Sequence, residues 1–164
     1  MRAMSELAPR RSRILASATL GVRSDVAAAL SLAAAAIHLV VIGPHFAEWW
    51  AYGAFFLAAT VGQAAFAVAV QLRTPTWLLM AGIGGNLAIV AMYVVSRTNG
   101  PPLGPHAGRP EPAELLDVAC TAAELALIVA LLGLLPAPVA RRTATALALV
   151  GLALWTGRLT GVLL

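Results

Sequence analysis

One face of an apolar segment in the carboxyl-terminal half of the chain carries polar residues at helical spacing. They fall at i, i+3, i+4 and i+7: Asp117, Cys120, Thr121 and Glu124. A charged side chain at the centre of a bilayer costs roughly 2.5–3.5 kcal/mol on insertion scales, so Glu124 should face other helices rather than lipid. Its expected neighbours, each in a different apolar segment, are His38, Gln63 and Asn86. The pattern predicts a polar site inside a helical bundle.

Other polar residues extend this site toward one end of the predicted bundle. The predicted ligand-binding residues are His38, Glu48, Tyr52, Gln63, Asn86, Arg97, Asp117 and Glu124. The predicted metal ligands are His38, His45, Glu48, His106, Asp117 and Glu124. Histidine combined with carboxylate suits Zn²⁺ or Cu²⁺. A membrane haem is disfavoured, because it needs two deep axial histidines and only His38 lies deep in a segment.

These residues do not form a diagnostic metal motif. His38 and His45 are seven residues apart, but Gly43 and Pro44 are expected to break the helix between them. A purely structural interpretation also stays open, in which His38 bonds a backbone carbonyl and a neutral Glu124 bonds an amide side chain.

The composition predicts that helices in a membrane position these residues. The chain has 164 residues, of which 60% are hydrophobic and only 11% are charged. A soluble domain has about 45–50% apolar and about 25% charged residues, so a soluble enzyme is excluded. All eleven basic residues are arginine, and they are scattered at helix ends. That distribution favours a role in topology over nucleic-acid binding.

Five apolar segments are long enough to cross a bilayer, and only helices fit them. Their approximate ranges are 25–42, 49–72, 76–96, 114–135 and 143–164, after an arginine-rich amino-terminal segment at 1–24. Polar stripes on the second, third and fourth segments, together with His38 in the first, predict a four-helix bundle. The fifth segment has no such stripe and should be peripheral, and a four-helix bundle with the first segment peripheral instead is the main alternative. The predicted fold is therefore an all-α integral membrane protein with five transmembrane helices.

The arginine count in alternate loops predicts the orientation. Eight arginines fall on one side, in the amino-terminal segment, the 73–75 turn and the 136–142 link, whereas the 43–48 turn and the 97–113 loop together hold two. The positive-inside rule then places the amino terminus in the cytoplasm and the carboxyl terminus outside the plasma membrane. The polar site opens outward in this topology, beneath a Gly/Pro-rich 97–113 loop that is expected to act as a shaped lid.

Three sequence pieces carry a resemblance: HFAEWWAYG at 45–53, GNLA at 85–88, and a pattern RTxGxPxGP from Arg97 to Pro105. Together they resemble a group of small, uncharacterised bacterial multi-pass membrane proteins. The resemblance covers about residues 30–135. It implies a membrane location and supplies no activity or ligand.

Three functions are compatible with this pattern. The first is binding or sensing of a metal ion or a small polar ligand in the outward pocket. The second is an accessory or scaffold subunit that packs through Ala/Gly surfaces against another membrane protein or a second copy. The third is a membrane enzyme that uses Glu124 as acid or base with His38. Convergence of His38, Asp117 and Glu124 would favour the first or third, and dispersal would favour the second.

Overall fold

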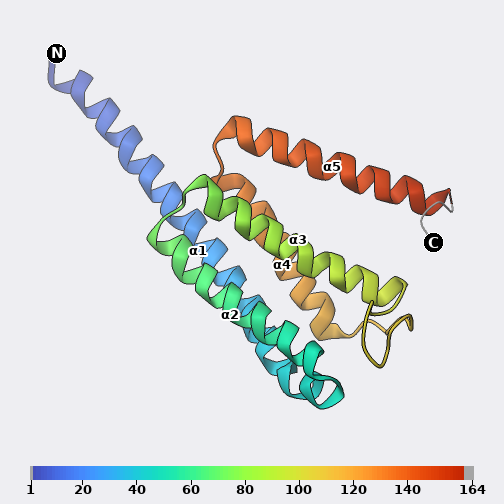
Figure 1. The fold of residues 1–164 in the computed structure, drawn as a ribbon. Helices are drawn as coiled ribbons and strands as arrows, with labels where there is room; N and C mark the ends of the chain where they lie inside the picture. Colours follow the sequence, from blue (N-terminus) through green and yellow to red (C-terminus); the bar gives the residue numbers. More distant parts are fainter. Residues whose placement is uncertain (1, 161–164) are drawn as a thin grey trace. The chain divides into compact units, whose positions relative to one another are not determined.

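The computed structural model describes residues 2–160, with side chains from residue 21 onward, and the regular secondary structure in this part of the chain is all α-helix. The five helices are α1 Arg2–Glu48, α2 Trp50–Leu72, α3 Thr76–Thr98, α4 Leu115–Leu134 and α5 Ala137–Leu159 (Figure 1). Each contains a stretch that is long and apolar enough to cross a membrane. The predicted all-α class and the number of spans are confirmed.

Helix α1 differs from its prediction, because it does not break at Gly43 and Pro44. It continues to Glu48, and the candidate span within it is Gly21–Glu48. Pro44 removes only one backbone donor, and this loss falls close to the end of the helix, where membrane helices tolerate it. His45 Nδ1 then donates to the Val41 carbonyl at 2.7 Å. His38 and His45 therefore lie two turns apart on one continuous helix.

Helices α1 to α4 form one compact unit, which ends at Leu134. Helix α1 packs along both α2 and α4, and α4 also packs against α3, whereas α2 and α3 meet over a smaller area through side chains (Figure 1). Small side chains such as Ala27 and Ala34 are fully buried on α1 and allow close helix approach. Gly82 on α3 also allows a close approach, because a Cβ at this position would collide with the Phe66 ring of α2. This packing brings one face of each helix to a common centre.

Helix α5 belongs to a second unit, which begins at Leu135. It starts at Ala137, earlier than the predicted segment, because Pro136 and Pro138 suit the position before a helix and its first turn. None of its described residues is buried. The predicted four-helix unit is thus confirmed, and the peripheral position of the fifth helix stays a prediction. The end of the predicted fifth segment, residues 161–164, and the side chains of the amino-terminal arginines up to Arg13 lie outside the described residues.

Candidate functional site

A cavity of about 280 Å³ lies within the α1–α4 unit, and polar groups stand at its two ends. The inner end is lined by His38, Cys120 and Glu124, and the other end by Arg97 and residues of the 99–114 loop. The walls between them are mostly apolar or aromatic. We call the inner group the buried cluster, which consists of His38, Gln63, Asn86, Cys120 and Glu124. We call Glu48, Arg97, His106, Glu111 and Asp117 the mouth cluster.

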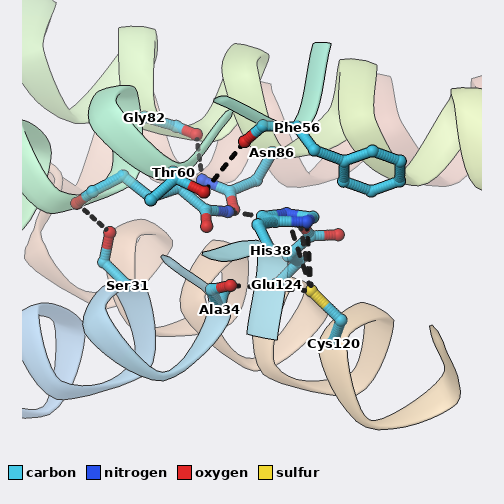
Figure 2. Close-up of polar contacts among 10 residues, drawn as sticks. Ser31, Ala34, His38, Phe56, Thr60, Gly82, Asn86, Cys120 and Glu124 are labelled. Carbon is cyan, nitrogen blue, oxygen red and sulfur yellow. Dashed lines mark hydrogen bonds and ion pairs between the residues drawn. The ribbon is translucent and has the colours of Figure 1, made fainter. Parts of the chain in front are cut away.

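All four helices contribute to the buried cluster (Figure 2). Glu124 on α4 is 1% exposed, and the other members are also buried. Its carboxylate Oε1 lies 3.1 Å from Nε2 of His38 on α1 and accepts a 3.2 Å hydrogen bond from Nε2 of Gln63 on α2. The predicted placement of Glu124, away from lipid and against these neighbours, is confirmed.

An amide chain supports Glu124 from behind. Gln63 Nε2 also donates to Oδ1 of Asn86 at 3.2 Å, and Asn86 Nδ2 donates to the Gly82 carbonyl at 2.8 Å. The two atoms closest to the Gln63 amide nitrogen are the oxygens Asn86 Oδ1 and Glu124 Oε1, which act as acceptors here. The amide must therefore point its NH₂ group toward them. Gln63 Oε1 is then left without a partner within the described structure. The buried cluster therefore retains one spare acceptor.

Three atoms of the buried cluster form a triangle of potential metal ligands. His38 Nε2 lies 3.1 Å from Glu124 Oε1 and 3.6 Å from Cys120 Sγ, and Sγ lies 3.9 Å from the same Oε1 (Figure 2). Zinc bonds of about 2.0–2.3 Å at tetrahedral angles give ligand-to-ligand edges of about 3.3–3.6 Å. The observed edges differ from these by a few tenths of an ångström. A small divalent ion would fit with little movement of the side chains.

The same triangle does not have the geometry of a catalytic relay. A Cys–His–carboxylate triad places the nucleophile on one ring nitrogen and the carboxylate on the other. Here the carboxylate lies on Nε2 of His38, and Cys120 Sγ is also closer to Nε2 than to Nδ1, at 3.6 Å against 4.0 Å. Convergence on one nitrogen favours chelation over proton relay.

The mouth cluster is built around Arg97 at the end of α3. Its Nη1 and Nη2 donate to Glu111 and Asp117, each at 2.5 Å, and its guanidinium lies 5.2 Å from the ring centroid of Tyr93. The backbone N–H of Glu111 donates to the Ser96 carbonyl at 3.1 Å, so the loop is fixed beside the pair. One guanidinium thus pairs with two carboxylates and offsets one of their two negative charges.

The 99–114 loop is fastened to the helices at a second place. His106 Nε2 lies 2.9 Å from Glu48 Oε1, and the Tyr52 hydroxyl donates to the Leu103 carbonyl at 2.7 Å. Gly104 has φ +93° and sits against Tyr52 and Trp49, where a Cβ would clash. Only glycine satisfies both the conformation and the close approach. Leu103 and two prolines of this loop line the cavity, so the loop closes part of its mouth.

The structure divides the predicted site residues between the two clusters. Those in the buried cluster are His38, Gln63, Asn86 and Glu124, and those in the mouth cluster are Glu48, Arg97, His106 and Asp117. Tyr52 and His45 line the cavity walls. The six predicted metal ligands therefore do not meet at one point. Two separate pairs form, His38 with Glu124 in the buried cluster and Glu48 with His106 in the mouth cluster. Asp117 instead pairs with Arg97, and His45 bonds a backbone carbonyl.

Cys120 is the residue that the sequence did not predict as a ligand. Its position on the stripe, one turn before Glu124, was the available signal. No protein-family model, curated protein or solved structure matches this chain. The function therefore has to be argued from the geometry of the site.

Proposed function

We propose that this integral membrane protein binds one divalent transition-metal ion, with Zn²⁺ as the best fit, at His38, Cys120 and Glu124. The observation that carries the proposal is the triangle of Nε2, Sγ and Oε1, whose edges match those of a zinc tetrahedron. Zinc accepts mixed nitrogen, sulfur and oxygen ligands without a geometric preference of its own. The earlier alternative, Cu²⁺, prefers tetragonal nitrogen and oxygen sites and fits this set less well.

The charges around the cavity support binding of a cation. Three carboxylates, those of Glu111, Asp117 and Glu124, line it together with the single guanidinium of Arg97. Arg97 is occupied by the first two, so Glu124 has no cationic side chain of its own unless His38 is protonated. A bound metal would supply that positive charge, and the Cys120 thiol would lose its proton on binding.

Metal content tests this proposal directly. The protein would be purified in detergent without a histidine tag, stripped with a chelator, reloaded with Zn²⁺ and analysed by elemental mass spectrometry. We expect about one zinc per chain for the wild type and His45→Gln, and clearly substoichiometric zinc for His38→Gln and Cys120→Ser. His45→Gln is the matched control, because His45 lines the same cavity outside the triangle. Equal zinc in all four proteins would refute the site.

We also propose that the protein lies in the plasma membrane with its amino terminus in the cytoplasm and the pocket opening outward. The arginine asymmetry between alternate loops supports this orientation. Ala107→Cys and Ala137→Cys, each in a Cys120→Ser background, place one exposed thiol in the 99–114 loop and one at the start of α5. A membrane-impermeant maleimide should label only position 107 in intact cells. Labelling of position 137 alone would reverse the orientation.

A further inference from the structure

The cavity is larger and more apolar than a metal ion requires. One water molecule needs roughly 10–15 Å³ of such volume, so an ion with one water uses a small part of the cavity of about 280 Å³. Pockets for small molecules begin at about 300 Å³. The walls beyond the ligand triangle are apolar or aromatic and include Ile37, Val41, Phe55, Phe56, Ile89 and Met92. These walls are suited to an organic body rather than to an ion.

The proposed metal site also has an open coordination position. Structural zinc sites have four protein ligands, whereas sites that bind an exchangeable ligand have three. Within the described residues, no fourth His, Cys, Asp or Glu joins His38, Cys120 and Glu124. All three line the cavity, so the fourth position is reached from the cavity. A head group bound there would have the apolar walls next to it.

We infer that the pocket binds a small, mainly apolar organic molecule with one metal-coordinating head group of the carboxylate or hydroxamate class. The head group would bind the metal from the cavity side, at the open fourth position and, for a bidentate hydroxamate, at a fifth position as well. The body would lie against Phe56, Ile89 and Met92. This inference rests on the metal site proposed above. It adds to the metal site the chemical class of the organic ligand. A site for an ion alone would not need the apolar walls, and a purely apolar pocket would not need the metal ligands.

Cobalt-substituted protein tests the ligand class, because a Co²⁺–thiolate band reports the metal site independently of any organic ligand. The probe is benzohydroxamate, with benzamide as the matched body without a chelating group and acetohydroxamate as the matched head group without a body. We expect benzohydroxamate to shift the cobalt d–d bands in a saturable, one-site manner. Acetohydroxamate should bind at least about tenfold more weakly, because it buries no ring, and benzamide should leave the bands unchanged.

A second test uses a substitution that fills part of the pocket with a larger side chain. Ile89→Trp adds bulk to a cavity wall, and Val94→Trp adds the same bulk to an exposed position on the same helix. Ile89→Trp should retain the thiolate band and bind benzohydroxamate at least about tenfold more weakly, whereas Val94→Trp should bind like the wild type.

The outcomes separate the two proposals. If no thiolate band forms in the wild type, the metal site itself is wrong. If the band forms but saturating benzohydroxamate leaves the spectrum unchanged, or bleaches the band by stripping the metal, the metal site stands and the ligand inference is overturned. Equal affinity for benzohydroxamate and acetohydroxamate, or no loss of affinity in Ile89→Trp, would also overturn it, since the body would then lie outside the cavity.

Discussion

The buried cluster and the mouth cluster each contribute three residues to the lining of one cavity, but their polar atoms have different kinds of partner. In the mouth cluster, one guanidinium lies between two carboxylates, and Glu48 pairs with His106. In the buried cluster, a histidine nitrogen, a thiol and one amide group surround one carboxylate. Each cluster keeps one buried polar atom without a partner in the part of the chain described, Gln63 Oε1 in the buried cluster and Arg97 Nε in the mouth cluster. Each carboxylate of the mouth cluster has an arginine or histidine partner, whereas Glu124 in the buried cluster has no arginine beside it and gains most from an added cation.

This difference separates two ways in which a membrane protein keeps ionisable side chains. Paired charges near the end of a bundle hold a loop in place, and the partial exposure of their side chains keeps the cost of desolvation low. A deep carboxylate without a cation is expensive unless it is neutral or binds one. The following variants test whether the two clusters differ in this way.

The largest expected effect comes from Glu124→Leu. It leaves the Gln63 amide without one acceptor and His38 without its carboxylate partner. We expect the free energy of unfolding of the metal-free protein to fall by about 3 kcal/mol, and zinc binding to be lost. The conservative variant, Glu124→Gln, keeps an acceptor for Gln63, so it should lose zinc but less than about 1 kcal/mol of stability. Thermal unfolding in detergent, together with zinc content, measures both effects. Wild-type zinc in Glu124→Gln would remove Glu124 from the site.

Arg97→Met breaks the mouth cluster and should act on stability alone. It leaves Glu111 and Asp117 side by side without their cation. We expect a loss of about 1–2 kcal/mol in the free energy of unfolding, because the pair is only partly exposed, and zinc should stay at one per chain. The control, Arg73→Met, removes an exposed arginine and should change neither quantity. Loss of zinc in Arg97→Met would show that the two clusters are not independent.

Gln63→Leu should weaken the proposed zinc site without removing a ligand. Gln63 positions the Glu124 carboxylate through a hydrogen bond, and loss of such a supporting group costs about tenfold in metal affinity. Competition with a fluorescent zinc chelator measures the affinity. Gln71→Leu on the same helix is the control, since Gln71 donates to Asp25 at an exposed position. An equal effect of both variants would argue against a specific supporting role for Gln63.

The smallest expected effect is that of a truncation after Pro136. The four helices of the first unit contain both clusters, and none of the described residues of α5 is buried. The shortened protein should elute as one monodisperse species and bind zinc like the full chain. A truncated protein that aggregates or fails to bind zinc would show that the fifth helix supports the site.

Helical periodicity was sufficient to predict which faces of the bundle meet. The stripe that ends at Glu124 turned toward His38 and Gln63, since every other orientation would have placed a carboxylate in lipid. Arg97 and Asp117 were both predicted at the site, but their pairing was not, because periodicity fixes a direction and not a partner. The sequence therefore predicted the fold and the faces that form the candidate site, and left the contacts open.

Two features were beyond such reasoning. Cys120 and His38 are 82 residues apart, so no local spacing motif could show that they meet. The break predicted at Gly43 and Pro44 was wrong for a different reason. Helix propensity accounts for the backbone hydrogen bond that proline removes. Whether the helix ends there depends also on how near the proline is to the end of the helix and on which groups surround it. Only the assembled structure supplies both.

The continuity of α1 through Pro44 has a mechanical consequence. His38, in the buried cluster, and Glu48, which holds the loop through His106, lie ten residues or about 15 Å apart on one unbroken helix. Since the helix is continuous between them, a displacement of His38 along the helix axis would also move Glu48. Binding of an ion at His38 and the contact between Glu48 and the 99–114 loop would therefore both depend on the position of α1.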